Sequence, residues 1–576
     1  MDSVQGREFD LLIKDVKLVN VFNDSVTPAS IGVTGDRIEY IGEAQASFKA
    51  ADTIDGEGLY ALPGFIDSHM HLESSMLPPQ AFACRALECG TTMVAADPHE
   101  ICNVLGPKGV YALMEAASGT PLKVLMLAPS TVPSAPGFEG SGCAVGPVEA
   151  AEMLDHPGIF GLGEVMDFNG VADGEESILS VIREARARGL MIDGHAAVLT
   201  GERLQRFAAA GIDSDHTAVS PEKLQELLAL GFCVQIQENG LSPEMVQAMN
   251  ELPVSNRVCL VTDDVALDKL MHQGHLNHVV ARAIGLGLDP LKAIRFATIN
   301  AADRLRQYDT GAIAPGRLAN IQLVRDLKAP QPELLVVEGK VILERGRLKF
   351  SPRPCDLSAL RDHPMQVKEV RTEDFFIPVD AKLSDSRAKV NIIHQDGSSY
   401  RTKRMLRDLP LIDSPQGRTV DITGFFKIAV FNRYGLDRHS LALIDNMAGF
   451  DGAIALTYGH DAHNLTVYGS DDGDMALAAN AVRQMRGGMC AVQRGEILAR
   501  VPLPLGGLMS QEPAEVLTTQ VDGFLAACHQ IGLRHAKPIS FLTLMPLAVS
   551  PEIKCTDTGL IDVVNKRKIP LIEECY

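Results

Sequence analysis

The sequence predicts an α/β protein whose central unit is a (β/α)8 barrel of the TIM type. One observation supports the barrel, and a second indicates that further domains accompany it. Between residues 61 and 305, eight short apolar runs alternate with stretches of helical periodicity, which is the pattern of repeated strand–helix units. The chain has 576 residues, too many for one barrel of roughly 250 residues, so further domains are expected on either side.

The predicted elements follow in chain order. Residues 9–60 contain short strands broken by turns, for example 10–13, 18–21, 31–33 and 37–42. The eight barrel strands are predicted at 61–68, 91–96, 123–128, 158–163, 191–194, 212–215, 232–237 and 258–262. Helical periodicity between and after them is clearest at 176–188, 221–230, 276–287 and 290–305. A doubly wound open sheet has the same alternation, but candidate ligands spread over the whole series of strands favour a closed barrel.

Strands resume after the barrel, at 321–324, 334–337 and 340–343. We expect them to join the N-terminal strands, so that residues 1–60 and 306–350 build one small β domain from both flanks of the barrel at 61–305. The stretch 350–380 is rich in Pro, Arg and Asp and is predicted to be a linker. Residues 380–576 alternate strands and helices and are predicted to form a separate C-terminal α/β domain.

Composition narrows the class of partner. The formal net charge is −20, from 53 Lys and Arg against 73 Asp and Glu, so a nucleic acid or an anionic membrane is not an expected partner. No secretory signal and no membrane-spanning apolar run is visible. The 11 cysteines are scattered without a C-x-x-C pair, which is typical of a reduced, cytoplasmic protein.

The leading chemical motif is His69-Met70-His71, directly after the apolar run 62–67. Residues i and i+2 of an extended strand point the same way, so both imidazoles can reach one metal ion. The C-terminal ends of barrel strands are also where such folds place their chemistry. A pair of surface histidines in a loop is the alternative interpretation of this motif alone.

Four further predicted strands end in residues that commonly bind metals: Glu164, His195, His216 and Asp263. Four imidazoles and two carboxylates exceed what one catalytic ion needs, whereas two divalent ions would use the whole set. His69, His71 and Asp263 would hold one ion, and His195 and His216 the other, with Glu164 between them. Water shared by two such cations would be largely deprotonated at neutral pH and could act as a nucleophile. The N/O donors suit Zn, Mn or Fe(II) without choosing among them.

Longer motifs resemble a known family. Residues 63–76, which include the H-x-H pair, resemble the amidohydrolase superfamily, and the tail Leu72–Met76 is similar to bacterial adenine deaminases. The similarity continues through Ala96–Gly106, Gly161–Asp167, Thr262-Asp263-Asp264 and Gly274-His275-Leu276, then through the C-terminal segments Gly459–Asn464 and Leu503–Ser510. The resemblance implies a binuclear enzyme that converts adenine and water to hypoxanthine and ammonia.

The resemblance also suggests roles for individual residues. The nucleophile would attack C6 of the purine, and Asp263 would pass its proton to the leaving amine. Glu238 is the candidate proton donor to a ring nitrogen, and His99 is a further catalytic candidate. Glu73, Glu100 and His275 are candidate substrate-binding residues. His460 and His463 are expected to have a structural or pocket-capping role, with a separate metal site as the alternative.

Two loops depart from the family pattern. The chain has Gln237-Glu238-Asn239-Gly240 where an Arg usually precedes the Glu, and Ala196-Ala197-Val198 where Ala-Pro-Gly is usual. Another aminopurine or a cyclic amide is therefore an alternative substrate, and a catalytically inactive relative is the alternative to an enzyme. A homo-oligomer, dimeric or larger, is expected from the resemblance.

Overall fold

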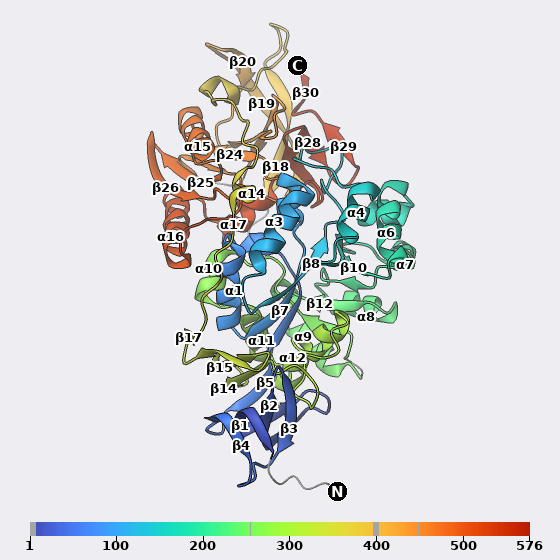
Figure 1. Cartoon of the computed structure of the whole chain (residues 1–576). Coiled ribbons are helices and arrows are strands. Elements are labelled where there is room, and N and C mark those ends of the chain that lie inside the picture. Colours follow the sequence, from blue (N-terminus) through green and yellow to red (C-terminus); the bar gives the residue numbers. More distant parts are fainter. Residues whose placement is uncertain (1–6, 254, 396–401, 446–448) are drawn as a thin grey trace.

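The structure, a computed structural model, describes residues 7–576 except 254, 396–401 and 446–448. Three regions follow one another along the molecule (Figure 1). A mainly antiparallel sheet built from both flanks lies at one end, the parallel strands with their helices form the middle, and a second large sheet made by the C-terminal third lies at the other end.

The middle region contains all eight predicted parallel strands. They are β6 (Phe65–Met70), β7 (Thr91–Ala96), β8 (Lys123–Ala128), β9 (Ile159–Val165), β10 (Met191–Gly194), β11 (Ser214–Asp215), β12 (Cys233–Ile236) and β13 (Val258–Leu260). Neighbours pair in parallel in a five-stranded sheet, β10-β9-β8-β7-β6, and a three-stranded sheet, β11-β12-β13. The α/β class is therefore confirmed, and the central strands form two sheets.

Two contacts join the edges of these sheets. Asp263, just after β13, pairs in parallel with Met70, and its N–H donates to the His69 carbonyl at 3.2 Å. At the other edge β10 contacts β11, but no ladder is formed between these two strands of the described chain. Both strands are short there, and a Cβ at Gly194 would lie 2.1 Å from the Ser214 carbonyl oxygen, so the backbones approach closely.

Helices alternate with the parallel strands as expected for strand–helix units. The longer ones are α1 (Pro79–Glu88), α3 (Pro107–Ala117), α4 (Pro147–Leu154), α6 (Glu176–Ala187), α7 (Gly201–Ala209), α8 (Pro221–Ala229), α9 (Pro243–Glu251) and α11 (Leu276–Gly285). Shorter helices are α2 (His99–Leu105), α5 (Phe168–Asp173), α10 (Leu267–His272), α12 (Pro290–Phe296) and α13 (Ile299–Arg304). Helix α6 illustrates the expected amphipathic spacing. It buries Ile178, Val181, Ile182 and Ala185, which follow the i, i+3, i+4, i+7 pattern.

The first predicted barrel strand, 61–68, is in fact two strands separated at Gly64. The first, β5 (Tyr60–Pro63), pairs with strands of the flanking sheet, whereas β6 begins the parallel set. A Cβ at Gly64 would lie 2.5 Å from Thr92 Cγ2, so only glycine fits at this crossing. The sequence predicts one strand here because both halves of the run are apolar, and periodicity does not reveal the change of sheet.

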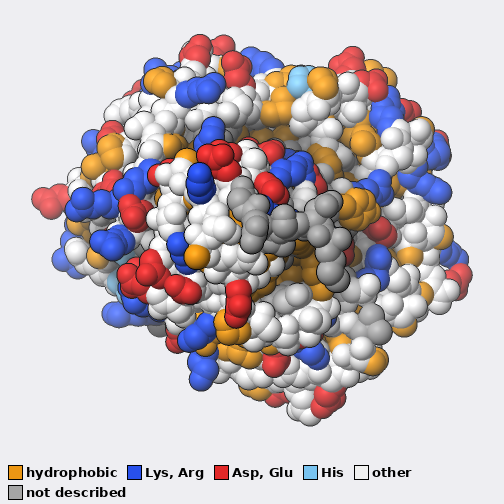
Figure 2. All heavy atoms as spheres, turned by 60° about the horizontal axis from the view of Figure 1, so that its bottom comes forward, with side chains coloured by type: hydrophobic (Ala, Val, Ile, Leu, Met, Phe, Trp, Pro, Cys, Tyr) orange, Lys and Arg blue, Asp and Glu red, His pale blue; other side chains and the backbone are white. Residues whose placement is uncertain are grey.

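The flanking sheet takes strands from both sides of the middle region. Its members are β1 (Glu8–Asn20), β2 (Ser25–Thr34), β3 (Arg37–Gly42), β4 (Lys49–Asp55), β5, β14 (Ile321–Val324), β15 (Pro332–Val337), β16 (Lys340–Glu344) and β17 (Arg347–Leu348). Strand β14 pairs antiparallel with β5, which joins the two flanks, and the sheet has its own apolar cluster. When this end of the molecule is turned forward, acidic and basic side chains are interspersed over the visible face (Figure 2).

The C-terminal third is dominated by a ten-stranded, mostly antiparallel sheet. Its strands are β18 (Arg387–Gln395), β19 (Thr402–Ser414), β20 (Gly417–Val420), β21 (Phe426–Phe431), β22 (His439–Ile444), β23 (Ala453–Leu456), β24 (Leu465–Gly469), β25 (Gly488–Gln493), β26 (Glu496–Pro502) and β30 (Ile572–Cys575). Helix α15 (Asp472–Gln484) packs on β23, β24 and β25. The other elements are α14 (Ser358–Arg361), α16 (Ala514–Gln530), α17 (Pro538–Leu544) and a small sheet of β27 (Ile553–Thr556), β28 (Gly559–Asp562) and β29 (Arg567–Ile569).

Loops of this C-terminal sheet reach the parallel strands. The Tyr458 hydroxyl donates to the Ser74 carbonyl at 2.7 Å, and the Ser510 N–H donates to the Met76 carbonyl at 2.8 Å. These contacts bring the loops after β23 and β26 to the segment that follows β6. Within the described residues, no helix combines the length and the apolarity needed to cross a bilayer.

Candidate metal and catalytic site

The first three predicted ligands lie together at one end of the parallel strands. His69 lies within β6, His71 follows it, and Asp263 follows β13. Asp263 Oδ1 is 3.5 Å from His69 Nε2 and 3.2 Å from His71 Nε2. The alternation of side chains in an extended strand thus brings both imidazoles to one carboxylate.

Glu164, at the end of β9, lies at the centre of the remaining ligands. Its Oε2 is 2.6 Å from His195 Nδ1 and 3.4 Å from His216 Nε2, and its Oε1 is 3.4 Å from His71 Nε2. The structure therefore brings together all six residues predicted as ligands, although they come from five different strands. We call this set the Glu164 cluster: His69, His71, Glu164, His195, His216 and Asp263.

The Glu164 cluster offers donor atoms that bind divalent cations, and two of its ring nitrogens have no hydrogen-bond partner in the described chain. Three-donor groups whose ligand atoms lie within 4.8 Å of one another form from His69, His71 and Asp263, and from His69, Glu164 and His216. His69 Nε2 and His216 Nδ1 are buried ring nitrogens without a hydrogen-bond partner in the described chain. Imidazole and carboxylate donors of this kind suit Zn, Mn or Fe(II).

The histidines and carboxylates of the cluster shift each other's pKa. Burial alone would raise the pKa of Glu164, but the imidazoles of His216 and His195 outweigh it and hold that pKa well below its usual range. Burial would likewise raise the pKa of Asp263, but the nearby imidazoles of His69 and His71 outweigh it and hold that pKa well below its usual range. Burial, followed by repulsion from His69, lowers the pKa of His216.

Sequence reasoning missed the carboxylates that orient these ligands. Asp193 Oδ2 lies 2.7 Å from His69 Nδ1, and Asp97 Oδ2 accepts the Glu164 N–H at 2.7 Å. Asp67 accepts from the Thr262 hydroxyl at 2.6 Å, and Asp215 accepts from the Ala196 N–H at 2.7 Å. Three of these carboxylates could have been found from their spacing in the sequence. Asp67, Asp193 and Asp215 each precede a predicted ligand histidine by one or two residues.

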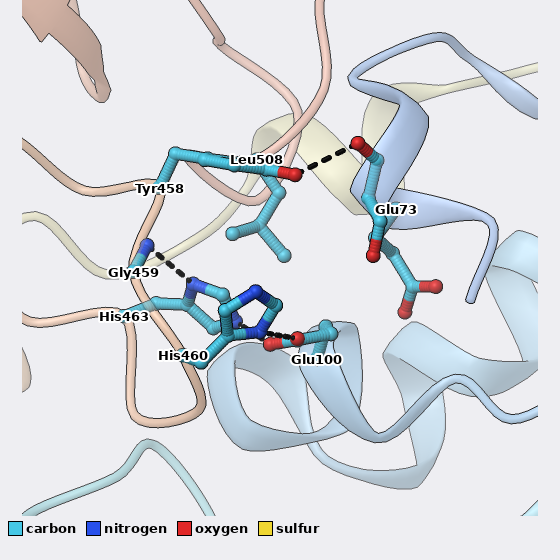
Figure 3. A pocket seen from close by; sticks show the side chains of 8 residues that line it. Glu73, Glu100, Tyr458, Gly459, His460, His463 and Leu508 are labelled. Carbon is cyan, nitrogen blue, oxygen red and sulfur yellow. Dashed lines mark hydrogen bonds and ion pairs between the residues drawn. The ribbon is translucent and has the colours of Figure 1, made fainter. Parts of the chain in front are cut away.

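His99 and Glu100 begin α2 and lie beside the Glu164 cluster. His99 Nδ1 is 3.6 Å from Glu164 Oε1, and its Nε2 is 3.6 Å from Glu100 Oε1. Glu100 is bound from the other side by two histidines of the loop after β23: His460 Nδ1 contacts its Oε1 and His463 Nε2 its Oε2 (Figure 3). The pocket-capping role expected of these histidines therefore corresponds to a direct contact with a predicted site residue.

Glu73 lies near Glu100 in the same wall. Its Oε1 accepts the Ile101 N–H at 3.0 Å, and burial raises the pKa of Glu73 to about 7. Glu73, Glu100, Tyr458, His460 and His463 are among the residues that line a pocket (Figure 3). This pocket has no room for a water molecule in this conformation.

Glu238 and His275 line a different and wider pocket, with Gln237, Asp264 and Lys269 among the other residues around it. The space inside this pocket that a water molecule can reach is about 30 Å³, which makes it the larger of these two pockets. Glu238 Oε2 accepts from Lys269 Nζ at 2.5 Å. The imidazole of His278, 3.6 Å from Glu238 Oε1, and then Lys269 lower the pKa of Glu238 to about 2. Glu238 is thus a carboxylate at neutral pH, which works against the proton-donor role predicted for it.

His275 is buried, and its Nδ1 hydrogen-bonds with the Thr91 hydroxyl at 2.9 Å. Burial, with a smaller effect of Arg85, lowers the pKa of His275 to about 3, so the ring is neutral. Its Nε2 lies 3.7 Å from Asp67 Oδ2 and has no hydrogen-bond partner in the described chain. His275 therefore lies beneath the wide pocket, whereas Glu238 lies at its rim.

Comparison with known proteins agrees with this arrangement. Residues 60–342 match the amidohydrolase family, and residues 401–567 match the adenine deaminase C-terminal domain. The adenine deaminase of Moorella thermoacetica is 36% identical over 98% of this chain and 96% of that protein. Adenine deaminase 2 of Carboxydothermus hydrogenoformans is 33% identical over 98% and 97%, and the adenine deaminase of Syntrophobacter fumaroxidans is 34% identical over 100% and 98%.

Among solved structures, N-isopropylammelide isopropylaminohydrolase from Burkholderia multivorans aligns with 59% of this chain and 99% of its own, at 20% identity and a TM-score of 0.45. The family assignment rests on the relatives that match over nearly their whole length. The chain belongs to the adenine deaminase family of amidohydrolases.

Proposed function

We propose that this protein catalyses the hydrolytic deamination of adenine, in which adenine and water give hypoxanthine and ammonia. The observation that carries the proposal is the convergence of His69, His71, His195, His216 and Asp263 around Glu164. The end-to-end similarity to adenine deaminases supports the choice of substrate.

The Glu164 cluster would hold two divalent cations, either Mn, Fe(II) or Zn. His69, His71 and Asp263 would bind one, His195 and His216 the other, and Glu164 would lie between them. Bound there, the cations would act as Lewis acids and lower the pKa of a nearby water. The carboxylates Asp193 and Asp97 support this assignment, because metal-binding side chains are usually oriented by such outer hydrogen bonds.

Among the chain's own groups, Asp263 is the proposed proton carrier. Its carboxylate would accept the proton of the attacking water and deliver it to the amine that leaves C6. Its side chain retains 16% exposure, whereas Glu164 and the H-x-H histidines are nearly inaccessible, so Asp263 lies on the open side of the cluster. His99 Nδ1, 3.6 Å from Glu164 Oε1, would position that carboxylate.

The purine would enter through the wide pocket lined by Gln237, Glu238 and Asp264. As a carboxylate held by Lys269, Glu238 would accept a hydrogen bond from a ring N–H and so orient C6 toward the cluster. His275 would support the pocket from below through its contact with Thr91. Glu73 and Glu100 would form the adjacent wall rather than touch the ring.

Several finer predictions remain part of this proposal. The eight parallel strands would form one closed (β/α)8 barrel, supported by the contacts of β13 with β6 and of β10 with β11. Residues 1–60 with 306–350, 61–305 and 380–576 would be its three domains. The protein would work in the cytoplasm as a homo-oligomer, and the 11 free cysteines are consistent with a reducing compartment.

The test is ammonia release, with the ultraviolet change from adenine to hypoxanthine, for apoprotein reconstituted separately with Mn(II), Fe(II) or Zn(II). Turnover that needs the added metal is expected. Gln237 favours a second candidate, another 6-aminopurine, because it lines this pocket at a position where the sequence departs from the family pattern that it resembles. If the metal-loaded protein does not deaminate adenine but deaminates a substituted aminopurine, the second candidate would replace the first.

A further inference from the structure

Four side chains from two distant parts of the sequence meet on the far side of the His99 ring from Glu164. His99 and Glu100 begin α2, whereas His460 and Asp461 belong to the loop after β23. His99 Nε2 is 3.6 Å from Glu100 Oε1 and 3.9 Å from Asp461 Oδ1. His460 Nδ1 is 3.8 Å from the same Asp461 oxygen and contacts Glu100 Oε1.

We propose that His99 Nε2, Glu100 Oε1, His460 Nδ1 and Asp461 Oδ1 form a site for a third divalent cation, of the Zn(II) or Mn(II) class. A tetrahedral ion with bonds of about 2.0–2.1 Å holds its donors about 3.3–3.4 Å apart. Three donor pairs are 3.6, 3.8 and 3.9 Å apart, within about 0.6 Å of that spacing. Glu100 Oε1 and His460 Nδ1 are in direct contact, so these two donors would have to move apart to bind the ion. Two imidazole nitrogens and two carboxylate oxygens are an ordinary donor set for such ions.

A buried polar atom without a partner, Asp461 Oδ2, supports the site independently of the donor spacing. Asp461 is 3% exposed, and its Oδ2 has no hydrogen-bond partner in the described chain. Glu100 is 2% exposed. In the part of the chain that the structure describes, neither carboxylate has a Lys or Arg within 4.0 Å. Two buried carboxylates need compensating positive charge, and a divalent cation between them would supply it.

The orientation of His99 fits a ligand of this site. Its Nε2 faces the four-donor group, while its Nδ1 faces the Glu164 carboxylate at 3.6 Å. A metal-binding imidazole usually directs its second N–H to a carboxylate or carbonyl, which fixes the ring and its tautomer. No member of the Glu164 cluster belongs to the new group, so the two sites share no ligand.

The surroundings indicate a structural ion. All four donors are protein atoms, and the adjoining pocket lined by Glu73, Glu100, Tyr458 and His460 has no room for a water molecule. Closed coordination of this kind is typical of structural sites, whereas catalytic ions keep an open position. The ion would tie the loop after β23 to the start of α2, with His463 holding the other oxygen of Glu100 (Figure 3).

The decisive experiment is anomalous diffraction at the manganese edge from crystals of the full-length protein reconstituted with Mn(II), together with Mn per chain by elemental analysis. We expect an anomalous peak among the four named donors, in addition to the peaks in the Glu164 cluster. The absence of that peak while the Glu164 cluster holds Mn would overturn the proposal. A peak at the four donors with an empty Glu164 cluster would support this inference and refute the two-ion part of the proposed function.

Two variants test the ligands. Asp461→Asn and His460→Gln should each lower bound Mn by about one ion per chain and remove the new peak, while the peaks in the Glu164 cluster remain. The matched controls are Asp522→Asn and His272→Gln, because these residues form a similar pair at 3.2 Å on the surface. Unchanged Mn content in both ligand variants would contradict the site. If a variant does not fold, the anomalous map of the unaltered protein decides alone.

Discussion

Asp193 Oδ2 and His69 Nδ1 lie 2.7 Å apart, and both side chains are fully buried beneath the Glu164 cluster. The opposite ring nitrogen of His69 points to Asp263 Oδ1 at 3.5 Å. Arg304 of α13 holds Asp193 in turn, because Arg304 Nη2 lies 3.5 Å from Asp193 Oδ1. A carboxylate thus fixes the ring of a proposed metal ligand, and a helix at the opposite end of the strands fixes the carboxylate.

Asp193→Asn should weaken metal binding about 10- to 100-fold, because the lost charge lowers the basicity of His69 and loosens its orientation. The measurement is competition for Mn(II) or Zn(II) against a chelator of known affinity. Asp213→Asn is the matched control, since Asp213 also pairs with Arg304, at 3.2 Å, but contacts no proposed ligand. Equal metal affinity in the Asp193 variant and the unaltered protein would remove Asp193 from the site.

Glu164→Gln should lower metal content and deaminase activity together, because the amide replaces the carboxylate between His71, His195 and His216. His195→Ala should do the same. Elemental analysis and ammonia release check this. Glu139→Gln is the control: Glu139 is also buried, but its hydrogen bonds go to Ser134 and the Ala135 N–H. Full activity in a Glu164→Gln variant depleted of metal would refute the proposed role of the ions.

Glu238→Gln should leave the bound metal unchanged and lower kcat, since Glu238 lines the pocket proposed to take the purine and is paired with Lys269. A loss of about 10- to 100-fold is expected for one hydrogen bond to the reacting ring, at about 1.5–3 kcal/mol for a bond to a charged group. Steady-state kinetics on adenine, with metal analysis of the same samples, measure this. Glu244→Gln, on the exposed start of α9, should change neither quantity. Unchanged kcat in the Glu238 variant would exclude this residue from the reaction.

The free energy of unfolding should decrease as the pH is lowered, because His363 is buried in its neutral form. Burial, and then the neighbouring Arg433, lower the pKa of His363 to about 3 from 6.5. Below pH 6.5 the unfolded chain therefore binds a proton that the folded chain does not, so stability is lost as the pH falls from 6.5 toward 3, by on the order of 1 kcal/mol per unit. Denaturant unfolding at pH 7.5 and pH 5 should show a smaller acid loss in His363→Gln than in the unaltered protein. An equal loss in both would show that His363 does not carry this dependence.

Much of the fold could be predicted because its elements depend on local patterns. The eight apolar runs and the stripe of α6 follow from side-chain periodicity, which acts over a few residues. The division of the run 61–68 between two sheets could not be predicted in this way. It depends on the space left beside Gly64 by Thr92, which lies on another strand.

The family and the six residues of the Glu164 cluster could be predicted from the sequence, because residue types, strand ends and the i, i+2 spacing can be read along the chain. The surroundings of these six residues depend on tertiary packing. It places Asp193 against His69, pairs Glu238 with Lys269, and brings His460 and Asp461 to His99 and Glu100, some 360 positions earlier in the chain. Contacts of this kind depend on how whole sheets and loops pack, and no local pattern of residues specifies them.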